Sequence, residues 1–198
     1  MRKVIFILFV VVVFCSGKAQ LLDSLTLDTL TPYTSLSEAL KNPDKVIKLV
    51  LRKEHLKTIP NAIFQFKNLQ YLDLAKNNIK EIPDSIEVLK NLQYLDISKN
   101  TLQSLNGKIG KLTNLFYLNL NNNEFSGLPS TMGNLVNLRV LDLWSNNLDE
   151  FPENLKNMKS LQVLDLRAIL IPDDKQRYIL SLFPNTKVHL SPSCNCKW

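Results

Sequence analysis

A 23-residue repeat runs through most of this 198-residue chain and constrains its fold more than any other feature. The phrase Leu-x-x-Leu-x-Leu, with isoleucine in its last place in the second copy, opens five successive units, at Leu69, Leu92, Leu115, Leu138 and Leu161. In four of these units an asparagine follows three residues after the phrase: Asn77, Asn100, Asn123 and Asn146. A divergent first copy, Val-Ile-Lys-Leu-Val-Leu, begins at Val46. Self-similarity at a fixed period of this length predicts a stack of structurally equivalent units.

The physical chemistry of one unit supports this interpretation. Alternation within the phrase buries the leucines at the fourth and sixth places and leaves the residue between them exposed on a strand. The asparagine turns the chain out of the strand, and its amide can bond backbone groups of neighbouring coils. An apolar-Pro pair later in most units, such as Ile59-Pro60, precludes a long helix. Asn106-Gly107 replaces that pair once and predicts a local irregularity on the outer side. Since one unit cannot bury its own leucines, the units must share a core.

The pattern Leu-x-x-Leu-x-Leu-x-x-Asn-x-Leu resembles the leucine-rich-repeat family from residue 46 to about residue 190, and its small exported bacterial members in particular. The resemblance implies an α/β fold, a curved right-handed leucine-rich-repeat solenoid. Its parallel β-sheet lines the concave face, and short helical or extended segments line the convex face. It further implies a protein that binds a ligand on the concave face and is not an enzyme. The absence of any Asn-x-Ser/Thr site also fits a bacterial origin.

The first 19 residues predict a secretory signal peptide. Arg2 and Lys3 precede an apolar run from Val4 to Cys15, and small residues follow up to Ala19, where we expect cleavage. The apolar run is shorter than the roughly 20 residues that span a bilayer. We therefore expect an exported protein, either periplasmic or secreted to the cell surface, with no stable membrane span once residues 1–19 are removed.

The remaining chain divides into a repeat region over residues 46–168 and two ends that cap it. In the N-terminal lead-in, residues 20–45, Ser35 and Glu38 have the capping-box spacing that opens a short helix, and Pro43 stops it. In the C-terminal cap, residues 169–198, Pro172 starts a helix that buries Tyr178, Ile179, Leu182 and Phe183, and Lys187–Leu190 forms an edge strand. The tail cysteines, Cys194 and Cys196, could be paired, free or bridged to another chain.

Charge and motifs argue against nucleic-acid binding and catalysis. Without residues 1–19 the chain has 21 basic and 18 acidic residues and no dense basic stripe. It contains no G-x-S-x-G, no H-E-x-x-H and no glycine-rich phosphate loop. His55 and His189 fall in the first and last strand regions, too far apart to share a metal. We therefore predict no catalytic residues, no metal and no cofactor.

The repeat register names the side chains expected on the concave face. Tyrosines occupy the third place on adjacent strands, acidic and amide residues the fifth, and Trp144 the seventh. Tyrosine and tryptophan are enriched among binding hot spots, but tyrosines on neighbouring strands also stabilise a sheet, and the acidic residues can simply keep it soluble. The predicted partner-binding residues are Tyr71, Tyr94, Tyr117, Trp144, Asp73, Asp96, Asn119, Asp142, Asn121, Lys76 and Lys99.

Three functions remain open at this stage. The first is recognition of a protein partner through the concave strands. The second is binding of a glycan or the bacterial cell wall, because aromatic platforms flanked by Asp and Asn also suit sugars. The third is a structural envelope component without a specific ligand.

Overall fold

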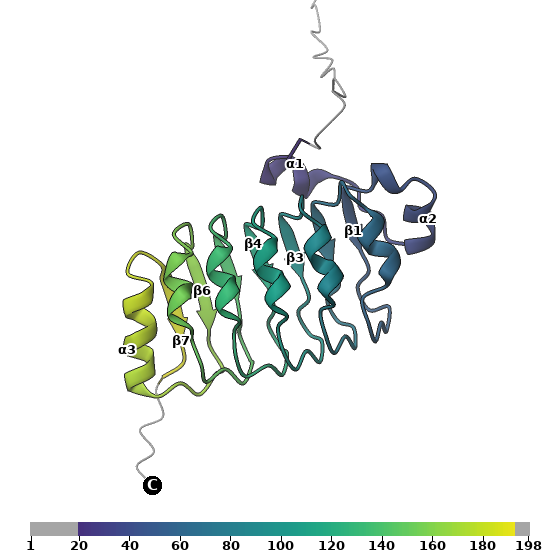
Figure 1. The fold of residues 1–198 in the computed structure, drawn as a ribbon. Helices are drawn as coiled ribbons and strands as arrows, with labels where there is room; N and C mark the ends of the chain where they lie inside the picture. Colours follow the sequence, from purple (N-terminus) through teal and green to yellow (C-terminus); the bar gives the residue numbers. More distant parts are fainter. Residues whose placement is uncertain (1–19, 193–198) are drawn as a thin grey trace, which may run out of the picture.

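The computed structural model describes residues 20–192, so the predicted signal peptide, Cys194 and Cys196 lie outside the described residues. Seven parallel strands form one open sheet in chain order (Figure 1). Neighbouring repeats pair in the same register, as in Tyr71 with Tyr94 and Tyr94 with Tyr117. The predicted leucine-rich-repeat solenoid is confirmed. The strands are β1 (Lys48–Val50), β2 (Tyr71–Asp73), β3 (Tyr94–Asp96), β4 (Tyr117–Asn119), β5 (Val140–Asp142), β6 (Val163–Leu166) and β7 (Lys187–Leu190).

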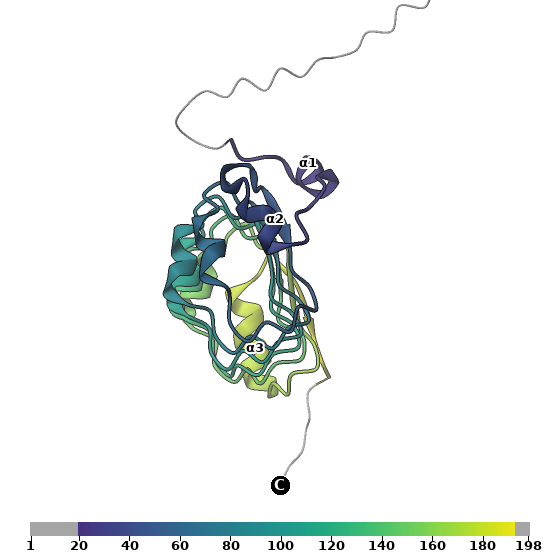
Figure 2. The same cartoon turned by 90° about the vertical axis from the view of Figure 1, so that its right-hand side faces the viewer.

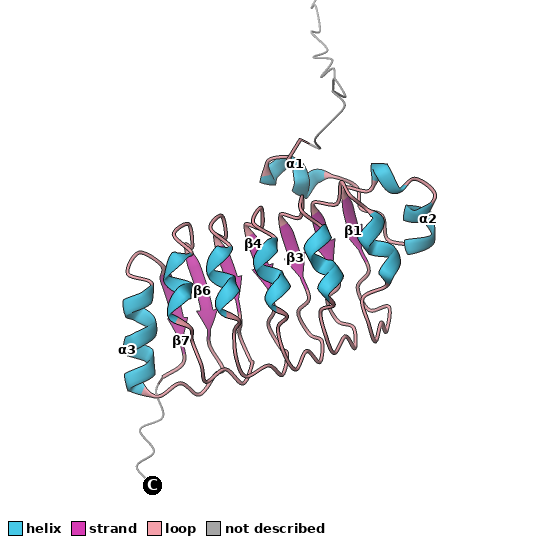
Figure 3. Cartoon of the chain, in the orientation of Figure 1, coloured by secondary structure: helices cyan, strands magenta, loops and turns pink. Residues whose placement is uncertain are grey.

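A row of short 3-10 helices lies opposite the sheet (Figures 2 and 3). Four of them follow directly after a proline, whose fixed φ suits the position before a helical turn. The irregularity expected at Asn106 is absent, because its side chain accepts a hydrogen bond from the Lys108 N–H (2.9 Å) and caps a helix of the usual length. The helices are η2 (Asn61–Gln65), η3 (Asp84–Val88), η4 (Gly107–Lys111), η5 (Ser130–Asn134) and η6 (Glu153–Asn157), preceded by η1 (Pro43–Lys45).

The core fills the space between the sheet and the helix row. The fourth-place leucines of the central strands, Leu72, Leu95 and Leu118, are fully buried, and so are Phe66 and Phe125. Because this cluster runs through every repeat, each unit completes the core of its neighbours, as expected of a solenoid.

The predicted asparagine contacts are confirmed as a buried ladder. Asn77 donates through Nδ2 to the carbonyl oxygens of Leu51 and Leu74 (both 2.8 Å), one in the preceding coil and one in its own. Asn100, Asn123 and Asn146 repeat these contacts. Backbone groups that the turn removes from the sheet are thereby satisfied.

A second asparagine ladder, which was not predicted, links each coil to the preceding one at the opposite end of the coil. Its members stand just before the first leucine of a repeat, and each donates to a carbonyl oxygen 24 residues earlier, as Asn91 does to Lys67 (2.8 Å). The other members are Asn68, Asn114 and Asn137. Their 23-residue spacing is visible in the sequence and was the available signal.

The N-terminal end contains two short helices, α1 (Ser24–Thr29) and α2 (Leu36–Leu40). Helix α2 begins as predicted, with the Ser35 hydroxyl accepting from the Glu38 N–H. Between the two helices Tyr33 bridges to Leu49 and so extends the sheet beyond β1. Helix α1 was not predicted from the sequence.

The C-terminal end contains α3 (Asp173–Leu182), which stands at the end of the helix row, and the edge strand β7 (Figure 1). Ile179, Leu182 and Phe183 are buried as predicted. The prediction was wrong for Tyr178, which is 41% exposed. Among residues 20–192, no helix is long and apolar enough to span a membrane.

Candidate binding surface on the sheet

The sheet face is defined here as the side chains at the third, fifth and seventh places of the seven strands. Its most ordered feature is the tyrosine ladder, Tyr71, Tyr94 and Tyr117. Successive rings lie 3.9 Å and 4.3 Å apart between centroids and are nearly parallel. Burial raises the pKa of all three phenols. Their stacking is the cross-strand contact that stiffens a sheet.

The fifth place differs from the prediction of an exposed row. Asp73, Asp96 and Asn119 are 2%, 4% and 8% exposed. Each side chain bends towards the following turn and accepts, through Oδ1, a hydrogen bond from the main-chain N–H two residues later, at 2.8–3.1 Å. These side chains stabilise the turn that ends each strand, and little of their surface is available to a partner. Asp142 makes the same bond to the Trp144 N–H (3.0 Å) but is only half-buried.

Burial also raises the pKa of Asp73, since a charged carboxylate is poorly solvated there and the Asp96 carboxylate lies nearby. The Ala75 N–H and the Arg52 guanidinium, 3.2 Å away, act in the opposite direction. At β6 burial again disfavours the Asp165 carboxylate, but hydrogen bonds from Arg167 outweigh it and lower its pKa. The carboxylates at the fifth place therefore differ along the stack, since the pKa of Asp73 is raised and that of Asp165 is lowered.

Trp144 is 37% exposed and lies apart from the tyrosine ladder. It stands four residues beyond Val140, the partner of Tyr117 in the register, so the tyrosine and tryptophan columns are about 13 Å apart at about 3.3 Å per residue. Its neighbours at the seventh place are Asn121, which donates to the Asp142 carboxylate (2.7 Å), and Arg167, which pairs with Asp165. Trp144 and the tyrosine ladder, which were predicted to form one binding surface, are therefore two separate aromatic sites.

Lys76 and Lys99 are exposed at the rim of the sheet face. Their backbones are left-handed, with φ of 61° and 55°, and the same conformation recurs at Asn122, Ser145 and Ala168 in the next repeats. The turn geometry therefore repeats whatever residue occupies the place, and it holds each side chain at the edge of the face.

The N-terminal strap, residues 20–30 including α1, lies on the strand side of the stack, against the edge of the sheet face where β1–β3 begin (Figure 2). Its contacts come from Gln70 and Gln93 at the second place of two repeats and from Lys48 on β1. Gln70 and Gln93 were not predicted as contact residues, and the only signal in the sequence was the glutamine directly before both Tyr71 and Tyr94.

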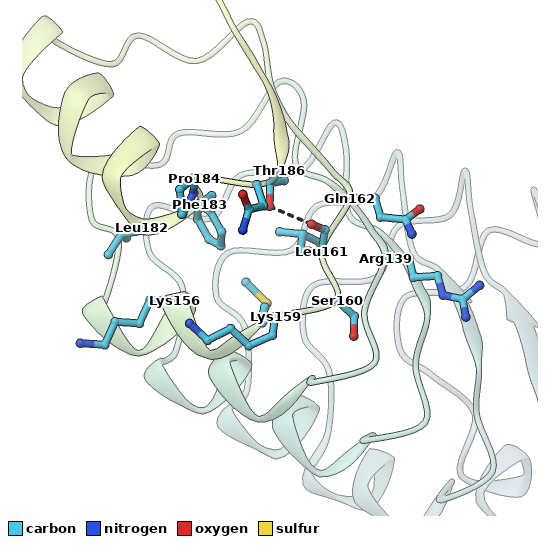
Figure 4. Close-up of a pocket in the computed structure, with 12 residues that line it drawn as sticks. Arg139, Lys156, Lys159, Ser160, Leu161, Gln162, Leu182, Phe183, Pro184 and Thr186 are labelled. Carbon is cyan, nitrogen blue, oxygen red and sulfur yellow. Dashed lines mark hydrogen bonds between the residues drawn. The ribbon is translucent and has the colours of Figure 1, made fainter.

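A groove of about 550 Å³ opens between the Lys159–Gln162 segment and the loop from Leu182 to Thr186 (Figure 4). Arg139, Lys156 and Lys159 line it, but Arg139 points away from the two lysines and Lys156 pairs with Glu153 (2.5 Å). These cations do not converge on one ligand position. Over residues 20–192, no three histidine, cysteine or carboxylate side chains come together as a metal site would require.

The chain matches a family described as leucine-rich repeat region over residues 45–182, and it belongs to the leucine-rich-repeat family. Proteins of this family typically are not enzymes, and the fold commonly mediates protein–protein interaction. No match was found among curated proteins.

Solved structures give three informative similarities. Internalin C2 from Listeria monocytogenes is 27% identical with a TM-score of 0.67, covering 81% of this chain and 67% of its own. Internalin InlF from the same species is 26% identical with a TM-score of 0.59, covering 69% of this chain and 39% of its own. The receptor kinase ectodomain GASSHO1/SCHENGEN3 from Arabidopsis thaliana, solved with Casparian strip integrity factor 2, is 27% identical with a TM-score of 0.58, covering 69% and 17%. The chain thus spans well under half the length of InlF and of the plant receptor.

Proposed function

We propose that this chain is an exported, non-enzymatic protein that binds a protein partner through its sheet face. The observation that carries the proposal is the exposure of Trp144 in the open part of that face, between Asn121 and Arg167. A large aromatic side chain left in solvent beside paired polar groups is typical of a protein-binding hot spot. The family's common use in protein–protein interaction supports the same conclusion.

Export rests on the predicted signal peptide over residues 1–19. We expect N-terminal sequencing of protein recovered from outside the cytoplasm to begin at Gln20. Recovery of the whole chain in the cytoplasm with Met1 retained would contradict export without bearing on the binding surface.

The binding proposal is tested by placing a photo-crosslinking amino acid at residue 144. Tyr178 provides a matched control position, because it is also aromatic and similarly exposed, 41% against 37%, but lies on α3. We expect one protein to be captured from envelope or medium extracts at position 144 and not at 178. Trp144→Ala should weaken binding of that protein at least tenfold, whereas Tyr178→Ala leaves it unchanged.

Other outcomes decide against the proposal. Loss of capture in the presence of soluble polysaccharide assigns the face to a glycan. Equal capture at positions 144 and 178 removes the sheet face as the binding surface, and no capture at either position favours a structural envelope component.

A further inference from the structure

The N-terminal strap is seated on the sheet face like a bound peptide. Figure 2 shows α1 on the strand side of the stack, away from the row of 3-10 helices. Leu27 of α1 is fully buried, yet it is not part of the continuous core that unites the repeats. The strap therefore covers the solenoid from outside and is no element of its interior.

Two buried glutamines hold the first residues of the strap by their main chain. The Leu22 N–H donates to Gln70 Oε1 (2.9 Å), and Gln70 Nε2 donates to the Gln20 carbonyl (3.1 Å). Gln93 Nε2 donates to the Leu22 carbonyl (2.9 Å) and also to Gln70 Oε1 (2.8 Å). Gln70 and Gln93 are 1% and 8% exposed. Because these bonds reach only backbone atoms, they place no requirement on the side chains of the bound segment.

Lys48 holds the other end of the strap. Its ammonium donates to the carbonyl oxygens of Leu27 (3.1 Å) and Asp28 (2.9 Å), near the end of α1, where unpaired carbonyls favour a cation. The same ammonium lies 4.5 Å from the centroid of the Tyr71 ring, so it joins the strap to the tyrosine ladder.

The strap offers little apolar surface of its own in return. Leu27 is its one fully buried side chain among the described residues, and Leu22 and Leu30 are half-buried, whereas Leu21 is 38% exposed and Leu25 is 78% exposed. A segment attached by one fully buried leucine, two half-buried ones and a few hydrogen bonds belongs to the less stable parts of a structure, which open before the core does.

We propose that the β1–β3 end of the sheet face is a peptide-binding surface that the chain's own strap closes at rest. This inference rests on the proposed protein-binding function. The partner is a protein segment with an extended stretch followed by a helical turn that carries one leucine. Gln70 and Gln93 bind its backbone, the site of Leu27 takes the leucine, and Lys48 binds the carbonyls that end the turn. A partner gains access by displacing the strap.

The test uses the full mature chain, residues 20–198, and a fluorescein-labelled synthetic peptide of residues 20–31. Leu27→Asp in the chain releases the strap, and we expect that variant to bind the peptide at least ten times more tightly than the unchanged chain does. A peptide with Leu27→Ala should bind at least tenfold more weakly, whereas Leu25→Ala, a matched change at an exposed leucine, leaves binding unchanged. A folded Leu27→Asp chain that binds no peptide overturns the proposal, as does equal loss from the two peptides.

A second measurement needs no variant of the chain. Millimolar unlabelled peptide, in the range of the effective concentration of a tethered segment, should accelerate hydrogen exchange of the chain's own Leu22 amide. An unchanged exchange rate contradicts displacement. A Leu27→Asp chain that dimerises in sedimentation without binding peptide also overturns the proposal, because the surface then serves a second copy. Capture at residue 144 reports on the open part of the face, so failure here leaves the proposed function standing.

Discussion

At the scale of single residues, we compare the two asparagine ladders. Each member of the inner ladder, the buried asparagines after the strands (Asn77, Asn100, Asn123 and Asn146), should stabilise the fold more than a member of the outer ladder, the asparagines before the first leucine of a repeat (Asn68, Asn91, Asn114 and Asn137). Asn100 accepts from the Ile79 N–H (2.9 Å) and donates to the carbonyls of Leu74 and Ile97 while 7% exposed. Asn100→Ala leaves these buried groups unpaired, so we expect the free energy of unfolding in urea to fall by at least about 2 kcal/mol. Asn91→Ala removes one hydrogen bond near the surface and should cost about 0.5–1.5 kcal/mol. Equal losses would mean that the inner ladder is not what holds the turns.

The negative charge on Asp73 lowers the stability of the folded chain, although its carboxyl oxygen is needed as the acceptor for the Ala75 N–H. Since burial raises its pKa, folding favours the protonated carboxyl, and the cost of the charged form disappears as pH falls through the folded-state pKa. Asp73→Asn keeps the acceptor for the Ala75 N–H, as Asn119 does at the same place. We expect it to raise stability at pH 7 by up to about 1 kcal/mol, because the ion pair lost with half-exposed Arg52 is weak.

The pH profile and one further variant check this account of Asp73. The advantage of Asp73→Asn in thermal unfolding should shrink steadily towards pH 3, where the native carboxyl is protonated. Asp73→Ala, which loses the acceptor, should be less stable than the unchanged chain by about 1–3 kcal/mol at every pH. An advantage of Asp73→Asn that is constant with pH contradicts a charge-based cause.

At the scale of elements, two glycines set how closely the 3-10 helices pack. A Cβ on Gly110 of η4 would lie 2.2 Å from the Thr131 carbonyl oxygen of η5, and one on Gly133 would lie 2.2 Å from that of Asn154 in η6. We expect Gly110→Ala to push η4 and η5 apart and lower the free energy of unfolding by about 1–3 kcal/mol. Gly127→Ala is the control, since nothing lies within 4 Å of its Cβ. Similar melting temperatures for both variants would show that the helix row adapts without cost.

At this scale the sequence predicts the interactions that recur in every repeat or follow a local motif, and it does not predict those that occur once. The strands, the inner ladder and α2 were predictable because the 23-residue period or a capping motif encodes each one locally. The strap was not, because it occurs once and its contact between Leu22 and Gln93 spans 71 residues. The burial of Asp73 and Asp96 was missed for a different reason. Strand alternation assigns a side chain to a face, but only the turn beyond the strand shows that the carboxylate bends back to bind it.

At the scale of the whole molecule, stability should be a sum over repeats and the interfaces between them. Deleting residues 92–114, one whole unit, joins Asn91 to Leu115 and restores the phrase that follows Asn91 in the native chain. Tyr71 would then stack on Tyr117, and Asn91 keeps its bond to Lys67. We expect the shortened chain to unfold cooperatively in urea at a lower midpoint, with a slope reduced roughly in proportion to its length. Deleting residues 92–102 instead removes half a coil and misaligns every later strand, so that chain should not fold. If both deletions fold, or neither does, the repeats are not the independent energetic units that their common register implies.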